Sequence, residues 1–573
     1  MISRPRFWFV LLASALFFFS HQAVSGAGNS PEDIYEAYCA TCHHPKRLGL
    51  TAPPLIPELY SKRVKSRLPE IIKNGLPATQ MPAFRDALSE EQINLLVEFI
   101  KTPVKDMGWT FDDIRSSVIK FDEPKKKLEA DLEDITLVME RGTKSLAVLD
   151  GNGFNELAKF RVGNVHGGPK FSFALDKVYS VARDGIVTKF DIKSLRTEMT
   201  LKAGINSRSI AVSHDDRIVA VPNYLPQNVV FFTSDLEPIH EIKVDDKIGG
   251  FYALPKLESF VMSFREKPEL WIIKDSAPFT VDKRRLPEAF HDFSISPKGS
   301  YIIGTKRGSD RMYIYDYEKD KILAKLSTSG LPHLASAAFY MHNGELFAAV
   351  NHIKKPIATI ISLDRFRKVA EIPLPGAGWF VRTHYATEYL WIDTETEKIA
   401  LVDKNDFSKV RFITPRPGRK AMHVEFSKRG DFALVTIPGA GGEVVIYDTK
   451  TLKRVKSLFY ERPVGKYNAT CKTYLERTLE APPSFEKNVS AGKKVFDNFC
   501  MGCHHQIYEA FGPSFEFIAK NRSEKQIRFH ILSPGASAKA LGYKRNSMPT
   551  IKLTGEQLDA VVQYIESFSE VGG

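Results

Sequence analysis

Cys39-Ala40-Thr41-Cys42-His43 stands near the start of the chain, and Cys500-Met501-Gly502-Cys503-His504 stands near its end. Both follow the pattern C-x-x-C-H, in which two thiols spaced two residues apart can bond to the two vinyl groups on one edge of a haem. The next histidine is then carried beneath the iron as an axial ligand. One such cysteine pair could also serve a zinc or redox site. Two copies, each in a small helical segment, predict two covalently bound c-type haems.

The residues around the first motif form a short helical pattern. A helix leads into Cys39 from about Pro31, a Met81-Pro82 pair follows in a loop, and Ser89 caps an amphipathic helix that ends near residue 101. This order resembles a class I cytochrome c over residues 28–110. The resemblance implies His43 and Met81 as the axial iron ligands, although Met81 could also be an ordinary core methionine. His44 lies next to His43 and cannot reach the opposite face of the haem.

The second motif stands in a similar segment, residues 488–573. A helix precedes Cys500, Met548-Pro549 lies in a loop, and an amphipathic helix runs from Thr554 to Phe568. This segment resembles a second class I cytochrome c, with His504 and Met548 as the axial ligands. His505 lies next to His504 and is a poor rival for the same reason as His44.

Between the two haem segments, a short apolar strand followed by aspartate recurs. The aspartates are Asp150, Asp191, Asp235, Asp275, Asp316, Asp364, Asp403 and Asp448, at steps of 39 to 48 residues. A period near 40 to 45 residues with several short strands per unit is typical of a β-propeller. We therefore predict a multi-domain protein in which two all-α cytochrome c domains flank an all-β, eight-bladed propeller over residues 136–474. The segments 111–135 and 475–487 are predicted linkers.

The first residues read as an export signal. Arg4 and Arg6 precede an apolar run over residues 7–19, and small residues follow up to Ala27. This is the pattern of a secretory signal peptide over residues 1–27, although an uncleaved anchor is an alternative. The predicted location is the periplasm, which agrees with the attachment of c-type haem after export.

Charge and cysteine content narrow the partners. The 573 residues carry a formal net charge of +12 that is spread along the chain, and no nucleic-acid-binding motif is visible. A basic surface suits electron-transfer proteins such as small cytochromes or cupredoxins, or a small anion. Four of the five cysteines belong to the C-x-x-C-H motifs. The fifth, Cys471, is expected to be a buried small side chain, with a ligand or redox role as the alternative.

The middle of the chain resembles the cytochrome cd1 family. The similarity covers almost the whole propeller and is carried by the segments 183–184, 207–209, 223–226, 267–271, 378–384, 423–426 and 462–468, together with the segment around His333. It implies a d1-type haem in the central channel. By this resemblance, His166 would be the proximal iron ligand and His291 and His333 the distal catalytic pair. Further residues would bind the cofactor, namely Arg183, Arg208, Arg265, Arg382 and His384.

Two branches of that family imply different reactions. Nitrite reductases use two distal histidines to protonate nitrite and release NO, whereas dihydro-haem d1 dehydrogenases act on a precursor of the cofactor. The run Leu334-Ala335-Ser336-Ala337 lacks an arginine that the reductases carry after the second histidine. We therefore expect a dehydrogenase that binds two haem c and a haem d1 or its dihydro form. A nitrite reductase and a non-enzymatic haem d1 carrier are the alternatives, and a homodimer is one assembly left open.

Overall fold

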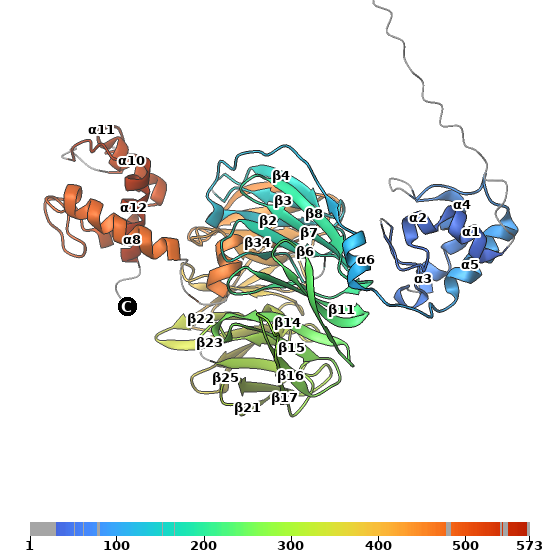
Figure 1. The fold of residues 1–573 in the computed structure, drawn as a ribbon. Helices are drawn as coiled ribbons and strands as arrows, with labels where there is room; N and C mark the ends of the chain where they lie inside the picture. Colours follow the sequence, from blue (N-terminus) through green and yellow to red (C-terminus); the bar gives the residue numbers. More distant parts are fainter. Residues whose placement is uncertain are drawn as a thin grey trace, which may run out of the picture. The chain divides into compact units, whose positions relative to one another are not determined.

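The computed structural model describes residues 30–50, 52–60, 62–76, 81–151, 153–165, 167–298, 300–476, 479, 483–538, 541–542 and 548–569. The predicted signal peptide therefore lies outside the described residues, as does His166. The chain divides into two compact units, Met1–Met107 and Gly108–Gly573. Figure 1 shows the first unit as the blue helices and the second as the strands and the orange to red helices.

The first unit is a small helical domain. Its helices are α1 (Pro31–Tyr38), α2 (Ala40–His43), η1 (Pro57–Leu59), α3 (Lys62–Lys65), α4 (Leu68–Asn74) and α5 (Glu90–Lys101). Ser89 begins α5 with a capping box: its hydroxyl accepts from the Gln92 amide, and the Gln92 side chain accepts from the Ser89 amide. The apolar face of α5 is buried with Ile34 and Tyr35 of α1. This packing fixes the short helix that carries the first C-x-x-C-H motif.

Eight antiparallel sheets make up most of the second unit, which confirms the predicted eight-bladed propeller (Figure 1). The first blade joins the two ends of the propeller sequence, because β34 pairs with β2. The strands of the first four blades are β34 (Pro463–Asn468), β2 (Thr136–Glu140), β3 (Ser145–Leu149) and β4 (Glu156–Arg161); β5 (Lys170–Phe171), β6 (Lys177–Val181), β7 (Ile186–Asp191) and β8 (Arg196–Lys202); β10 (Ala211–Val212), β11 (Ile218–Leu225), β12 (Gln227–Thr233) and β13 (Pro238–Lys243), with β9 (Asn206–Ser207) beside β11; and β14 (Ile248–Leu254), β15 (Ser259–Phe264), β16 (Glu269–Lys274) and β17 (Val281–Arg285).

The remaining four blades follow in chain order. Their strands are β18 (Asp292–Ile295), β19 (Tyr301–Thr305), β20 (Arg311–Asp316) and β21 (Lys321–Ser327); β22 (Ala338–His342), β23 (Glu345–Asn351), β24 (Ile357–Ser362) and β25 (Arg367–Pro373); β26 (Val381–Arg382), β27 (Tyr389–Asp393), β28 (Ile399–Asp403) and β29 (Val410–Ile413); and β30 (Met422–Phe426), β31 (Phe432–Ile437), β32 (Gly442–Asp448) and β33 (Arg454–Tyr460). Short 3-10 turns η3 (Pro255–Leu257) and η4 (Leu334–Ser336) interrupt the connections.

The repeated sequence motif corresponds to the third strand of each blade. That strand is nearly continuous in buried apolar residues, as in β3, β24 and β28, because it is covered on both faces by neighbouring blades. In most blades the aspartate at its end accepts from the main chain of the following turn: Asp316 accepts from the amides of Glu318 and Lys319, and Asp448 from those of Lys450 and Thr451. The motif is therefore a strand followed by an aspartate-capped turn.

The predicted linker 111–135 is bound to the propeller over part of its length. It contains α6 (Phe111–Ser116), β1 (Ile119–Lys120) and η2 (Leu132–Asp134), and β1 pairs with β8 at the edge of the second blade. Just before it, the Trp109 indole donates to the main-chain oxygen of Lys202. Pairing of β1 covers a sheet edge that would otherwise expose unpaired backbone groups.

After the propeller, η5 (Cys471–Leu475) is a single turn of π-helix. A second helical domain follows, made of α8 (Pro483–Val495), the π-helical turn η6 (Phe496–Cys500), α9 (Phe515–Asn521), α10 (Glu524–Leu532), α11 (Pro534–Ser537), α12 (Gly555–Glu566) and η7 (Ser567–Ser569). Its core forms where apolar residues of α12 pack against Val495, Phe496 and Phe515. Within the described part of the chain, no helix is long and apolar enough to cross a membrane.

Candidate functional site

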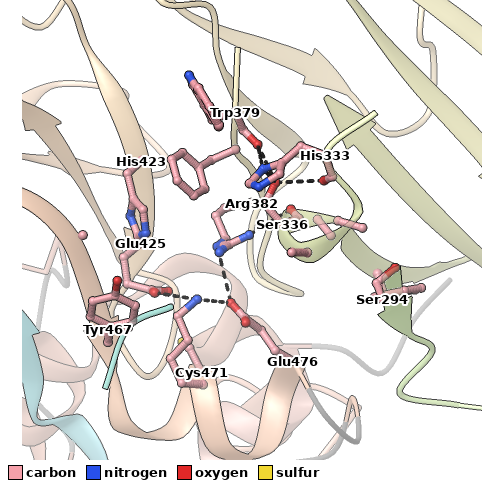
Figure 2. Close-up of a pocket in the computed structure, with 18 of the residues that line it drawn as sticks. Ser294, His333, Ser336, Trp379, Arg382, His423, Glu425, Tyr467, Cys471 and Glu476 are labelled. Atoms are coloured by element: carbon pink, nitrogen blue, oxygen red, sulfur yellow. Dashed lines mark hydrogen bonds and ion pairs between the residues drawn. The ribbon is translucent and has the colours of Figure 1, made fainter. Parts of the chain in front are cut away.

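A cavity of about 1270 Å³ lies within the propeller, which is larger than a pocket for a drug-sized ligand. Its lining includes residues on or next to the first strands of successive blades: His291 and Asp292 at β18, His333 before β22, Arg382 on β26, His423 on β30 and Tyr467 on β34. Figure 2 shows several of these side chains together. Residues from five blades therefore meet in this cavity.

His423 is the most unusual residue of the cavity. Its φ angle is +48°, a left-handed backbone conformation that is costly for any residue with a Cβ, and the pairing of β30 with β31 shifts register at this position. The side chain is buried, and Nδ1 has no hydrogen-bond partner among the described residues. Burial, together with the cations of Lys466, Arg382 and Lys472, holds the pKa of His423 well below its usual value. His423 is therefore a neutral imidazole, the form that binds iron.

Asp393 holds the backbone around His423. One oxygen of its buried carboxylate accepts from the amides of Trp379 and Phe380 at 2.7 and 3.1 Å, and the other accepts from the His423 amide at 3.1 Å. Gly378 is required next to these contacts, because a Cβ there would meet the main-chain oxygen of Asp393. Burial raises the pKa of Asp393 to about 6. The seventh and eighth blades are therefore joined at the point where His423 enters the cavity.

The two predicted catalytic histidines, His291 and His333, both line the cavity. Nδ1 of His333 lies 2.7 Å from the main-chain oxygen of Trp379, an acceptor, so Nδ1 carries a proton in this contact. The carboxylate of Asp292 accepts from the amide of Ala335 at 3.0 Å and so fixes the turn that follows His333. For His291, burial and the nearby cations of Arg265 and Arg307 lower the pKa to about 4.

His384 also lines the cavity, but its ring is occupied by the main chain. Nδ1 accepts from the amide of Ala386 at 3.1 Å, and Nε2 lies 3.2 Å from the main-chain oxygen of Lys428. Burial lowers the pKa of His384 to about 3. The ring shapes the cavity wall and has no free nitrogen for a ligand. The predicted proximal ligand, His166, cannot be compared because it is outside the described residues.

Of the four predicted arginines, Arg208 and Arg382 line the cavity, while Arg183 and Arg265 do not. Arg183, Arg208 and Arg265 form one basic region, because burial lowers the pKa of Arg183 and the cations of Arg208 and Arg265 lower it further. Arg265 and Arg208 also lower the pKa of His291. Two further arginines of the wall, Arg141 and Arg307, were missed from the sequence. Such a wall suits an organic anion with several carboxylates.

The two C-x-x-C-H motifs have the same geometry around their histidines. Nδ1 of His43 lies 2.7 Å from the main-chain oxygen of Pro53, and Nδ1 of His504 lies 2.7 Å from that of Pro513. A carbonyl acceptor fixes the proton on Nδ1 and leaves Nε2 to bind a metal. Gly512 is needed beside the second site, because a Cβ there would lie 2.5 Å from the His504 ring.

The neighbouring histidines use their rings differently from the predicted ligands. Nδ1 of His44 accepts from the amide of Lys46, and Nδ1 of His505 accepts from the amides of Ile507 and Tyr508. Met81 and Met548 are half-buried, and Met548 packs against the core of the second helical domain. Cys471 is buried, as predicted, with its sulfur 3.6 Å from the main-chain oxygens of Phe426 and Ser427.

The cavity residues fit an iron tetrapyrrole better than a bare metal ion. Among the residues that the structure describes, no group of three or more His, Cys, Asp or Glu side chains could hold a metal ion. The cavity instead offers the neutral ring of His423, beside the basic wall. One axial nitrogen and several cations are the requirements of an iron that is already held by a carboxylated macrocycle.

Comparison with protein families assigns all three parts of the chain. A model described as cytochrome D1 heme domain matches residues 130–472. Models described as cytochrome C oxidase, cbb3-type, subunit III and as cytochrome c match residues 26–100 and 489–569. The predicted order of cytochrome c, d1-type propeller and cytochrome c is thereby confirmed.

Individual relatives include proteins named for haem d1. The chain is 33% identical over 468 residues to the Dihydro-heme d1 dehydrogenase of Pseudomonas aeruginosa, which covers 78% of this chain and 95% of the relative. It is 28% identical over 364 residues to Protein NirF of the same organism, covering 58% of this chain and 90% of the relative. It is 24% identical over 520 residues to the Nitrite reductase of Stutzerimonas stutzeri, covering 76% of this chain and 91% of the relative. A solved structure described as Dihydro-heme d1 dehydrogenase NirN in complex with DHE matches with a TM-score of 0.70 at 32% identity, covering 78% of this chain and all of that one.

Proposed function

This chain belongs to the cytochrome d1 haem-domain family, and on that premise we propose that it is an oxidoreductase that removes two hydrogens from a dihydro form of haem d1 bound in the propeller cavity. The similarity to the Dihydro-heme d1 dehydrogenase of Pseudomonas aeruginosa, which covers 95% of that relative, supports this reaction. The two c-type haems, when attached, supply one-electron acceptors. The reaction breaks two C–H bonds, forms one double bond and releases two electrons and two protons.

The protonation of the cavity histidines favours dehydrogenation over reduction of nitrite. Because the pKa of His291 is lowered to about 4, its ring is neutral at neutral pH. Nδ1 of His333 donates to Trp379, so Nε2 is the ring nitrogen left to exchange a proton with the substrate. The neutral ring of His291 has no proton to spare for the reduction of nitrite to NO, which needs groups that donate protons, whereas a dehydrogenation needs groups that accept them.

We assign the following roles on this basis. His423 binds the iron of the substrate, held in position by Asp393. His333 acts as the base, with Asp292 fixing its turn. Arg208 and Arg382 pair with carboxylates of the substrate, and Arg183 and Arg265 support the basic wall electrostatically. His43 with Met81, and His504 with Met548, are the proposed axial ligands of the c-type haems.

The location and partners are part of the same proposal. Residues 1–27 direct export to the periplasm, where c-type haem is attached, and the basic protein passes electrons to soluble cytochromes or cupredoxins. These assignments rest on the sequence pattern and the net charge of +12.

The test mixes oxidised, haem c-loaded protein with dihydro-haem d1 without oxygen. Reduction of the c-type haems together with the appearance of the haem d1 spectrum is the expected result. In a second arm, reduced protein carrying haem d1 is mixed with nitrite and NO is monitored. Sustained NO formation without dihydro-haem oxidation would assign the chain to nitrite reduction. Tight binding with neither reaction would leave a carrier of the cofactor.

A further inference from the structure

His423 stands at an irregular point of β30, where the neighbouring strand does not supply its main-chain partners. Met422 pairs with Thr436 and Val424 pairs with Val435 of β31, so the pairing steps over His423. Its φ of +48° is a further departure from strand geometry. A buried peptide N–H or C=O needs a hydrogen bond from another source when its own sheet offers none.

Side chains from the two flanking blades supply these bonds. The amide of His423 donates to Asp393 of the seventh blade at 3.1 Å. Its main-chain oxygen accepts from Nζ of Lys466, which lies on β34 of the first blade. The same amine donates to Oγ1 of Thr436 at 2.6 Å, and Thr436 in turn donates to the main-chain oxygen of Val464 at 2.9 Å. One amine therefore ties the carbonyl of His423 to both β31 and β34.

Lys466 is an unusual residue for this place. It is 0% exposed, and both of its acceptors are uncharged, one a main-chain oxygen and the other a hydroxyl. Burial of an amine among uncharged partners costs free energy. A left-handed backbone, a register shift and a buried amine thus meet at His423. Costly features of this kind collect at sites where the geometry serves a function.

The two main-chain bonds fix the direction of the His423 side chain. Each peptide group is planar, so holding the N–H on one side of the Cα and the C=O on the other fixes both backbone angles and the Cα–Cβ bond. The rings of Phe380 and Tyr467 then confine the imidazole, with centroids 4.6 and 5.7 Å away, and Figure 2 shows Tyr467 beside His423. Lys466 does not line the cavity, whereas its neighbours Gly465 and Tyr467 do. It therefore acts from behind the imidazole.

From this geometry we propose that Lys466 is a positioning residue that sets the orientation of the His423 ring toward the iron of haem d1 by holding the His423 carbonyl. The inference rests on the part of the proposed function that assigns His423 as the iron ligand. It does not require the dehydrogenation itself, because the ligand must be oriented for any use of the bound haem. Groups that orient a metal ligand in this way contribute about tenfold to a hundredfold to the affinity for the metal.

Two variants test this role in the full chain with both c-type haems attached. Lys466→Met removes the donor at nearly constant shape, and Thr436→Val removes one acceptor while the amine remains. Lys189→Met is the matched control, because Lys189 is also a buried lysine with two partners, Glu198 at 3.1 Å and Asp235 at 2.9 Å, but does not line the cavity. Denaturant unfolding establishes that each variant is folded.

The measurements separate the backbone from the bound haem. Hydrogen–deuterium exchange over residues 422–426 of the protein without haem d1 reports the backbone alone. Optical titration and electron paramagnetic resonance report the affinity for haem d1 and the ligation of its iron.

We expect Lys466→Met to raise the dissociation constant of haem d1 about tenfold to a hundredfold. It should also split the resonance signal of the histidine-bound iron, because the ring is no longer confined to one orientation. Exchange over residues 422–426 should become faster. Thr436→Val should change all three quantities in the same direction by less, and Lys189→Met should match the wild type in all three.

Several results would reject the positioning role and leave the dehydrogenase in place. A folded Lys466→Met variant with the wild-type dissociation constant and resonance signal is one of them. Equal effects of Lys466→Met and Lys189→Met would also reject it, because the change would then be a general result of losing a buried lysine. If Lys466→Met does not fold, wild-type values in Thr436→Val would reject the role.

The proposed function fails by different results. A wild-type protein that binds haem d1 through His423 but does not oxidise the dihydro form would reject the dehydrogenation, while the spectra of Lys466→Met would still decide the role of Lys466. A haem d1 spectrum that His423→Gly leaves unchanged would reject His423 as the iron ligand, and the positioning role with it.

Discussion

His423→Gly is the sharpest test of the cavity, because it should remove the proposed iron ligand at little cost to the fold. The native φ of +48° is strained for histidine and free for glycine, so the substitution recovers about 1 kcal/mol. It also removes a buried ring nitrogen that has no partner among the described residues, which recovers about 1–2 kcal/mol. The substitution loses about 3 kcal/mol of unfolding free energy through lost packing and a further ~0.5–1 kcal/mol through the flexibility of glycine in the unfolded chain.

The expected net loss of unfolding free energy is therefore only about 1–2 kcal/mol. His352 provides a matched control, because it is equally buried but both of its ring nitrogens are engaged, with the main-chain oxygen of Ser329 and with the hydroxyl of Thr359 at 2.9 Å. It does not line the cavity. Truncation of His352 to alanine loses packing and leaves buried partners unsatisfied, which should cost about 4 kcal/mol.

The assay combines unfolding with spectroscopy. Denaturant unfolding of the substrate-free protein, followed at the propeller transition, gives the two free energies. Optical and electron paramagnetic resonance spectra of protein loaded with haem d1 report the axial ligand. His423→Gly should lose the histidine-ligated spectrum and regain it when free imidazole is added, whereas His352→Ala should keep it. A His423→Gly variant that is as unstable as His352→Ala, or one with an unchanged haem spectrum, would refute the role of His423.

Further predictions follow from the other sites. Met81→Ala and Met548→Ala should each abolish the methionine–iron charge-transfer band of one c-type haem and lower its reduction potential, as redox titration would show. Because the pKa of His384 is depressed to about 3 from 6.5, its contribution to stability is complete above pH 6.5 and is lost as the pH falls toward 3, by about 5 kcal/mol in all. His384→Gln should flatten the acid limb of a plot of unfolding free energy against pH. His333→Ala should lower the single-turnover rate at least about a hundredfold with little change in substrate affinity. Asp393→Asn should cost about 2 kcal/mol, measured by denaturation, and weaken haem d1 binding, because an amide group would then face amide donors.

The features that the sequence predicts well are those with a local or periodic signal. The third strand of each blade is covered on both faces, and in most blades its final aspartate accepts from the amides of the following turn, so the pattern repeats along the chain. The C-x-x-C-H motifs are equally local, because the thiols and the histidine must serve one haem edge. In both cases the residues that make the interaction are close together in the sequence.

The features that sequence reasoning missed depend on residues that are distant in the chain. His423 was noted as part of a family-like segment, yet its left-handed backbone follows from a register shift in β30 and from Asp393 on another blade. The ion pair of Glu425 with Lys472 forms only when the propeller closes and brings η5 beside the eighth blade. Conversely, His384 resembled a cofactor ligand in sequence, and only the fold shows that main-chain groups occupy both nitrogens.

The number of c-type haems matches the number of electrons that the proposed reaction releases. A dihydro substrate delivers two electrons, and each c-type haem accepts one. His43 and His504 are held by the same carbonyl contact at the same distance, so the two sites are built to bind haem in the same way. The alignment with the dehydrogenase relative leaves about a fifth of this chain unmatched. A chain with two such haems can therefore take up both electrons of one turnover before it meets an external acceptor, and anaerobic single turnovers should reduce two c-type haems for each molecule of substrate oxidised.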